Sequence, residues 1–305
     1  MVYTVTFNPS LDYFVDVPDF RTGEVCRAET GVIRAGGKGI NVSLVLSLLG
    51  VKSFATGFVS GFTGREICRL LSDSGIGCDF AEIPGGMSRI NVKIRHGMET
   101  EINGSGPSVG EKEKKLLEEK LSRVKKGDFA VFSGSIPKGT ETSSYADIIA
   151  SFEEGVNTVV DAEGEILLKT LPLKPFLIKP NRSEAERILG RKISSPDQAL
   201  DCAEIFRAKG ARNVIVSLGA DGAVFSAEDG KGYIAGIPSD KTVNTVGSGD
   251  STVAGFISAC IKGMTPDDAF AFAVATGTAA AYKEGFPDET DIRKVLKGVT
   301  VIRRR

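Results

Sequence analysis

The chain of 305 residues contains a single histidine, His96, and no tryptophan. One histidine excludes sites that need two, such as a His-rich zinc site or an H-E-x-x-H protease. Lys and Arg total 38 and Asp and Glu total 39, so the net charge is −1. Because the chain has no excess of positive charge, nucleic acids and anionic membranes are not expected partners.

Cysteines are few and scattered, with no C-x-x-C pair: Cys26, Cys68, Cys78, Cys202 and Cys260. This odd, dispersed set favours reduced thiols over disulfides or a metal site. No apolar run approaches the roughly 18 residues of a membrane span. The N-terminus also lacks a basic stretch followed by an apolar one. We therefore predict a soluble, cytoplasmic protein.

Short β-branched runs alternate with amphipathic helical stretches along most of the chain. Strands are predicted at residues 2–7, 53–59, 129–132, 158–161, 176–178 and 213–217. Helices are predicted at residues 39–49, 65–71, 145–152 and 196–208, with three more from residue 251 onward. This alternation is typical of a doubly wound α/β fold, a mainly parallel sheet flanked by helices.

Two segments follow a different rhythm, because their apolar residues alternate with period two. They are residues 11–17 and 89–95, and residues 99–102 follow closely. Alternation suits strands with one exposed face. We predict a single domain, 1–305, with a small antiparallel β lid formed by two separate segments, about 11–34 and 88–104. Such a lid could close a cleft or pair with another subunit.

The stretch V-G-S-G-D-S at residues 246–251 comes just before an apolar helical run. Small residues at a helix start leave backbone N–H groups open at its positive end, which suits phosphate. Asp250 lies in the first turn, where it could be a catalytic base or only a helix cap. The stretch is not a Walker A loop, and Thr252 stands where a dinucleotide fingerprint needs its third glycine.

Two further stretches carry polar residues at expected helix starts. Gly36, Gly37, Lys38 and Asn41 would let a ligand approach the backbone closely and offer it a charge and an amide. Residues 179–184, K-P-N-R-S-E, follow a short strand. Their Asn and Glu, three residues apart, could hold hydrated Mg²⁺ or form a capping box, and both interpretations fit equally well.

Five motifs occur together in a fixed order: N-P-S-L-D at 8–12, G-G-K-G-I-N at 36–41, F-S-G-S-I-P at 132–137, K-P-N-R-S-E at 179–184 and N-T-V-G-S-G-D at 244–250. The set resembles the ribokinase-like (PfkB) carbohydrate kinases over the whole chain. The last motif is usually D-T-x-G-A-G-D in that family, so Asn244 and Ser248 are variants. R-I-N-V-K-I at 89–94 and E-T-E-I-N at 99–103 are similar to the branch that contains 1-phosphofructokinases and tagatose-6-phosphate kinases.

The resemblance implies a ribokinase-like fold and ATP-dependent phosphorylation of a ketohexose phosphate. Fructose 1-phosphate, converted to fructose 1,6-bisphosphate, is the expected acceptor. Tagatose 6-phosphate or fructose 6-phosphate as acceptor, an unphosphorylated sugar or nucleoside, and a non-catalytic sugar- or nucleotide-binding regulator remain alternatives. The implied cofactors are ATP and Mg²⁺, with a monovalent cation as a further candidate. The implied assembly is a homodimer through the β lid.

The resemblance also implies roles for individual residues. Asp250 would be the base, beside the N–H groups of Gly247, Ser248 and Gly249. The sugar phosphate would be bound by Asp12, Arg27, Gly36, Gly37, Lys38, Asn41, Arg89 and Ser133. The nucleotide would be bound by Lys179, Asn181, Ser217, Gly219, Gly222 and Gly249. Glu184 would orient Mg²⁺ through water.

Overall fold

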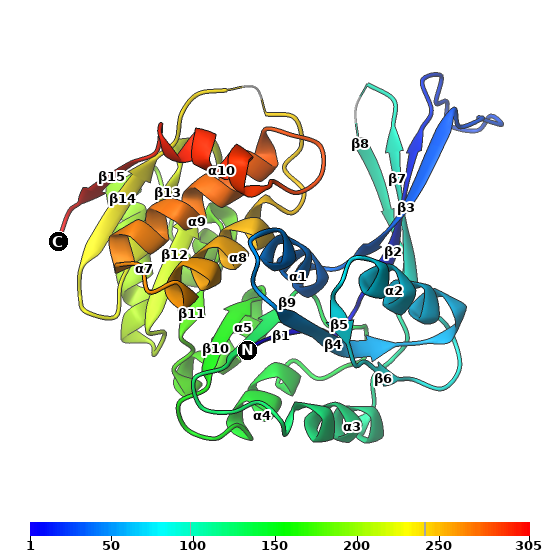
Figure 1. Ribbon diagram of the computed structural model, residues 1–305, viewed down its shortest axis with the longest axis horizontal. Helices are drawn as coiled ribbons and strands as arrows, with labels where there is room; N and C mark the ends of the chain where they lie inside the picture. Colours follow the sequence, from blue (N-terminus) through cyan, green and yellow to red (C-terminus); the bar gives the residue numbers. More distant parts are fainter. Residues whose placement is uncertain (98, 241) are drawn as a thin grey trace.

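The computed structural model describes residues 1–97, 99–240 and 242–305, without the side chain of Glu99. Within them, a large sheet covered by helices on both faces is joined to a small, separate sheet (Figure 1). The strands of the large sheet are β1 (Val2–Thr6), β4 (Ser53–Val59), β5 (Gly77–Cys78), β6 (Ala81–Glu82), β9 (Phe129–Ser133), β10 (Asn157–Asp161), β11 (Leu177–Ile178), β12 (Asn213–Ser217), β13 (Ala223–Ser226), β14 (Gly232–Gly236) and β15 (Thr300–Arg303).

The order of the large sheet is β15-β14-β13-β12-β11-β10-β9-β1-β4-β5, with β6 paired to β4. From β12 to β5 all neighbouring strands are parallel, whereas β13, β14 and β15 extend one edge in antiparallel fashion. The predicted doubly wound, mainly parallel α/β fold is therefore confirmed. The antiparallel edge was not predicted, because the turn at residues 217–222 was not recognised as the start of a hairpin.

Helices pack on both faces of the sheet, and the interior strands are apolar on both sides as buried parallel strands require. The helices are α1 (Lys38–Leu48), α2 (Gly61–Asp73), α3 (Glu111–Leu121), α4 (Ser144–Ala150), α5 (Gly164–Thr170), α6 (Arg182–Leu189), α7 (Pro196–Ala208), α8 (Ser248–Ile261), α9 (Pro266–Ala281) and α10 (Glu289–Leu296). None of these described helices is long and apolar enough to cross a bilayer.

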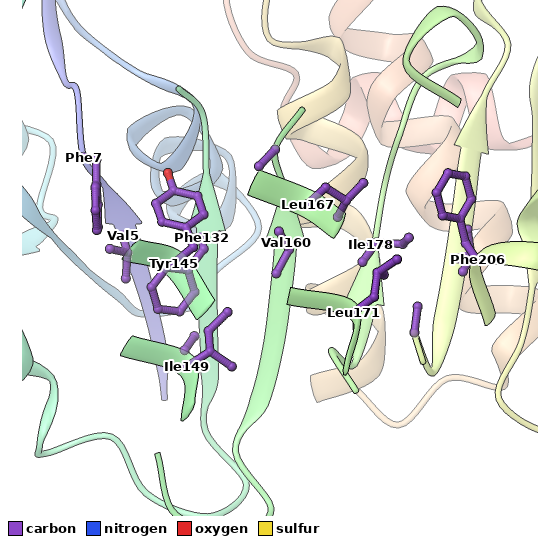
Figure 2. Packing of buried hydrophobic residues seen from close by; sticks show 14 of the residues in the cluster. Val5, Phe7, Phe132, Tyr145, Ile149, Val160, Leu167, Leu171, Ile178 and Phe206 are labelled. Carbon is purple, nitrogen blue, oxygen red and sulfur yellow. The ribbon is translucent and has the colours of Figure 1, made fainter. Parts of the chain in front are cut away.

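Each face of the large sheet packs against its own set of helices and forms a separate hydrophobic core. Alternate residues of the central strand β9 point into the two cores. In β9, Ala130 and Phe132 pack with α3 to α7, while Phe129 and Val131 pack with α1, α8, α9 and α10. Figure 2 shows the first core, where Phe132 lies against Tyr145 of α4. Both rings are fully buried, so the helices are fixed closely against the sheet.

The small sheet, called the lid below, has the strand order β3-β2-β7-β8 and stands away from the large sheet (Figure 1). Its strands are β2 (Ser10–Asp16), β3 (Thr30–Gly36), β7 (Arg89–Arg95) and β8 (Glu99–Asn103). The prediction of a wholly antiparallel lid was wrong at the central pair, because β2 and β7 are parallel. Each is the outgoing strand of its own hairpin, so the two run the same way when placed side by side.

The lid faces the carboxyl ends of the parallel strands. Chain segments leave β1, β10, β11 and β12 there, and α1, α6 and α8 begin at the same edge. In open α/β sheets ligands bind outside the carboxyl ends of the strands, where helix N-termini also point. The fold thus places the sequence motifs around one region.

Candidate active site

A cleft of about 1070 Å³ lies between the lid and this edge of the sheet. Most of the predicted site residues line it, although they come from segments far apart in the chain. They are Asp12, Gly37, Lys38, Asn41, Arg89, Lys179, Asn181, Glu184, Ser217, Gly219, Gly222, Gly247, Ser248, Gly249 and Asp250. The cleft is therefore a single site shared by the lid and both halves of the sheet.

Three predicted residues do not line the cleft. Gly36 ends β3 opposite the lid carboxylate of Asp12, and an added Cβ there would lie 2.5 Å from the Cγ of Asp12. Ser133 is fully buried at the end of β9, and its Oγ has no hydrogen-bond partner within residues 1–97, 99–240 and 242–305. Arg27 is exposed in the connection between β2 and β3. Gly36 is thus required for close approach, and Arg27 lies outside the cleft of its own chain.

Asp250 is the third residue of α8 and is only 5 % exposed. Gly247 is the N-cap, with φ of 78°, and as a glycine it supplies no side-chain capping hydrogen bond. The Oδ2 of Asp250 instead accepts a hydrogen bond of 2.8 Å from the Nδ2 of Asn41, in the first turn of α1. The alternative that Asp250 is only a cap is therefore disfavoured, because its carboxylate is bonded to the G-G-K-G-I-N motif at residues 36–41.

The surroundings of Asp250 raise its pKa to about 6. Burial is the main cause, and the nearby negative charge of Asp161 adds to it. The hydrogen bond from Asn41 and the charges of Lys38 and Lys179 act in the opposite direction. A carboxylate with a pKa near the working pH is well suited to accept a proton during a reaction.

Asp161, which the sequence analysis did not single out as a site residue, ends β10 beside Asp250. Its Oδ1 lies 3.4 Å from the Nζ of Lys38 and 3.6 Å from the Nζ of Lys179. Burial alone would raise the pKa of Asp161, but the two ammonium groups outweigh burial and hold the pKa below its usual value. Its position at the end of a predicted strand was the signal that could have identified it.

The lid contributes a row of polar side chains from alternate residues of β2 and β7. Asp12 Oδ1 accepts hydrogen bonds from Ser10 Oγ at 2.7 Å and from Asn91 Nδ2 at 2.8 Å. Two residues further along β7, the buried Lys93 pairs with Glu101 of β8 at 2.9 Å. The period-two pattern contained this row, and Asp12 and Arg89 were predicted as site residues, whereas Asn91 and Lys93 were not. The row fixes the direction of the Asp12 carboxylate.

Arg89 lies at the base of the lid, where its Nε donates to the backbone oxygen of Asn8 at 3.0 Å. It lines both the cleft and an adjoining cavity of about 330 Å³, which is also lined by Lys38 and Ser135. Burial lowers the pKa of Arg89. An arginine always carries its charge in proteins, so a partly desolvated cation faces this cavity.

Asn181 and Glu184, which were predicted as nucleotide-side residues, form a capping box at the start of α6. Asn181 Oδ1 accepts from the Glu184 N–H at 2.9 Å, and Glu184 Oε2 accepts from the Asn181 N–H at 2.8 Å. The capping interpretation is thus correct, and both residues still line the cleft. Cleft residues in the segment after β14 and at the end of α9, among them Pro238 and Tyr282, carried no recognised sequence signal.

Comparison with known proteins agrees with this geometry. A model of the pfkB family of carbohydrate kinases matches residues 5–291. The chain is 40% identical over 304 residues to a 1-phosphofructokinase of Bacillus subtilis, covering 99% of this chain and 100% of that one. It is 36% identical over 311 residues to a tagatose-6-phosphate kinase of Staphylococcus epidermidis, covering 99% of each. Phosphofructokinase-2 from Escherichia coli in complex with potassium superposes with a TM-score of 0.90 at 28% identity, covering 97% of this chain and 98% of that one.

The chain therefore belongs to the pfkB family of carbohydrate kinases. Its fold, its motifs and the cleft at the strand ends are those of an ATP-using sugar kinase.

Proposed function

We propose that this kinase transfers the γ-phosphoryl group of ATP to fructose 1-phosphate and forms fructose 1,6-bisphosphate. The observation that carries the proposal is the buried carboxylate of Asp250. It lies at the positive end of α8 and accepts a hydrogen bond from Asn41. Asn41 belongs to the G-G-K-G-I-N motif at residues 36–41, which we assign to the sugar and call the sugar-side motif. A base at that point adjoins both substrates. The 40% identity to a 1-phosphofructokinase supports the choice of acceptor.

In this reaction Asp250 accepts the proton of the attacking sugar hydroxyl. The hydroxyl oxygen forms the new bond to the γ-phosphorus, and the bond from that phosphorus to ADP breaks. The helix start at Gly247 and Gly249 directs backbone N–H groups to the charge on the transferred oxygens. The N–H of Ser248 already donates to the backbone oxygen of Thr245 at 3.3 Å, so it is only partly available to the phosphoryl group.

Recognition of the sugar phosphate is divided between the lid and the adjoining cavity of about 330 Å³, called the second cavity below. Asp12, oriented by Ser10 and Asn91, accepts hydrogen bonds from sugar hydroxyls. Arg89, with Lys38 and Ser135 beside it, lines a cavity large enough for a phosphate group. Charge-assisted hydrogen bonds there suit a dianion. A lid over the ring also keeps water from competing as acceptor.

The nucleotide and its ions occupy the other side of the cleft. Lys179, Asn181, Ser217, Gly219 and Gly222 line the part assigned to ATP. No group of three or more His, Cys, Asp or Glu that could hold a metal occurs among the described residues. Mg²⁺ commonly uses one carboxylate, waters and nucleotide phosphates, and the cleft-lining carboxylate of Glu184 fits that role. Mg²⁺ would neutralise charge on the phosphates. The relative crystallised with potassium supports a monovalent cation as a further ligand.

The choice of acceptor is tested by a coupled ADP-release assay. The panel contains fructose 1-phosphate, fructose 6-phosphate, tagatose 6-phosphate, fructose and ribose. We expect fructose 1-phosphate to give the highest kcat/KM, because the chain is 40% identical to a 1-phosphofructokinase. Arg89 and the second cavity favour the phosphorylated sugars of the panel over fructose and ribose. A tenfold or greater preference for tagatose 6-phosphate, about 1.4 kcal/mol, would reassign the enzyme as a tagatose-6-phosphate kinase. Absence of turnover with every sugar would favour a binding protein.

We further propose that two copies pair through the lid. Tyr13, Ile33 and Ile102 lie in one register row across the lid, and they are 37%, 51% and 57% exposed. Together with the half-buried Val92 between Tyr13 and Ile102, they form an apolar row of the kind that another protein often covers. The partner that we propose for this surface is the lid of a second copy of the chain.

The dimer is tested by light scattering with Ile33→Glu. The wild-type chain should have twice the mass of the 32.3 kDa monomer, and the variant should have the monomer mass because a charge cannot be buried in the lid interface. Ile302→Glu is the matched control, since Ile302 is 55% exposed on β15, away from the lid. A monomeric wild type, or equal masses for the wild type and Ile33→Glu, contradicts the proposal.

A further inference from the structure

One carboxylate oxygen joins the two halves of the cleft. Asp161 Oδ1 contacts Lys38, which begins α1 in the sugar-side motif, and Lys179, which follows β11 on the nucleotide side. The side chains of Asp161 and Lys179 are 2% and 5% exposed. Two ammonium groups from opposite sides are thus gathered at a single, desolvated atom.

Without Asp161 this arrangement would be unfavourable. Two neighbouring positive charges repel each other, and burial disfavours each charged form. A buried charge is tolerated only when an opposite charge or hydrogen bonds compensate it. Asp161 supplies that charge, and its proximity is the main reason why the pKa of Lys38 is raised. The second oxygen, Oδ2, is buried without a hydrogen-bond partner among the described residues. Asp161 therefore determines where both ammonium groups lie.

The gathered ammonium groups lie at the reaction centre. A Cβ added to Gly249 would be 2.9 Å from the Nζ of Lys179, so this ammonium group adjoins the first turn of α8. The charges of both lysines and of Asp161 act on Asp250. A phosphoryl group that enters here would meet helix N–H groups and two ammonium groups already in place. Groups fixed before reaction stabilise developing charge without the cost of reorganisation.

We propose that Asp161 is a positioning residue for phosphoryl transfer, which holds Lys38 and Lys179 at the start of α8 so that both ammonium groups bind the phosphoryl group in transfer. The inference rests on the proposed kinase function. It directs Lys38 toward the reacting end of the sugar and leaves the existing phosphate mainly to Arg89. Asp161 itself contacts no substrate in this arrangement.

The first experiment compares Asp161→Asn with the wild type. Asn keeps the size of Asp but cannot hold two ammonium groups by charge. We expect kcat to fall about 10- to 100-fold, while the KM values for sugar phosphate and ATP change less than kcat. Glu165→Gln, which removes a carboxylate paired with Lys169 on α5, is the control and should leave kcat unchanged. An Asp161→Asn enzyme within twofold of the wild-type kcat overturns the proposal.

A double-mutant cycle separates positioning from a general structural role. Because Asp161 acts through Lys179 as well as Lys38, Asp161→Asn combined with Lys179→Met should lose clearly less kcat than the product of the two single losses, since coupled residues are not additive. Multiplying losses overturn the proposal. Should Asp161→Asn not fold, Asp161→Ser takes its place in the cycle, with the same two outcomes.

A readout that needs no turnover keeps this inference distinct from the proposed function. Asp161, Lys38 and Lys179 are the charged groups that face Asp250, with Asn41 as its hydrogen-bond donor. Carbon NMR should place the pKa of Asp250 near 6 in the wild type and lower in Asp161→Asn, because a repelling charge is removed. An unchanged pKa overturns the placement even if the enzyme is active. A wild type that phosphorylates no sugar contradicts the proposed function, whereas the NMR result still decides the placement.

Discussion

Replacing Asp250 with Asn is expected to lower kcat by roughly 10²- to 10⁴-fold, the usual contribution of a general base. Asn has nearly the same shape and can still bond to Asn41, but its amide cannot accept the hydroxyl proton. Binding of both substrates and the melting temperature should change little. Steady-state kinetics, calorimetric binding of ATP and thermal unfolding measure these quantities.

Asp268→Asn is the matched control, because Asp268 is also the third residue of a helix, α9, but is exposed outside the cleft. It should keep full turnover. The pH profile gives an independent measure: with the pKa of Asp250 near 6, kcat should rise as pH increases through 6, where the carboxyl loses its proton. More than a tenth of wild-type kcat in Asp250→Asn, a change in barrier below about 1.4 kcal/mol, would exclude Asp250 as the base.

Replacing Arg89 with Ala is expected to raise KM for the sugar phosphate by roughly 10- to 100-fold, since losing a charged hydrogen-bond partner costs about 1.5–3 kcal/mol. KM for ATP should stay nearly constant, because Arg89 belongs to the base of the lid and the second cavity. Initial-rate kinetics with each substrate varied in turn provide the measurement.

Two comparisons sharpen this result. Arg89→Lys keeps the charge but loses the planar fork, so its KM should fall between those of the wild type and Arg89→Ala. With unphosphorylated fructose the difference between wild type and Arg89→Ala should vanish, because no phosphate remains to be bound. If KM for ATP increases while KM for sugar phosphate is unchanged, the two substrate sites have been assigned the wrong way round.

Local patterns predicted the regular elements well. The helix expected at 196–208 and the strand expected at 213–217 have the same bounds as α7 and β12. Both are periodic segments that end at clear turn signals. The pairing of β2 with β7 could not be predicted, because period two specifies the exposed face of a strand and not the direction of its neighbour. The edge strands β13 to β15 were likewise missed, since short strands carry little periodicity.

The candidate site was predictable where a motif and a helix start coincide. Gly247, Gly249 and Asp250 were identified in this way, and they line the cleft. The partners of Asp250 were not identified, because Asn41 and Asp161 become its neighbours only through folding. The role of Arg27 stays a prediction, since its charge type suits a phosphate but its connection between β2 and β3 lies exposed outside the cleft of its own chain. The chemistry of a residue can be judged from sequence, whereas its neighbours depend on topology.

The hydrogen bond between Asn41 and Asp250 joins residues 209 positions apart in the chain. Contacts at such separations are slow to form, because the entropy of closing a long loop must be overcome before the contact provides any stabilisation. The amino-terminal segments, with the lid and the glycine-rich start of α1, can assemble earlier, but the carboxylate of Asp250 reaches Asn41 only when α8 docks against α1. With Asp250 as the proposed base, we therefore expect catalytic competence to appear only after this docking, because a chain without it has the loops proposed to bind phosphate and no base beside Asn41.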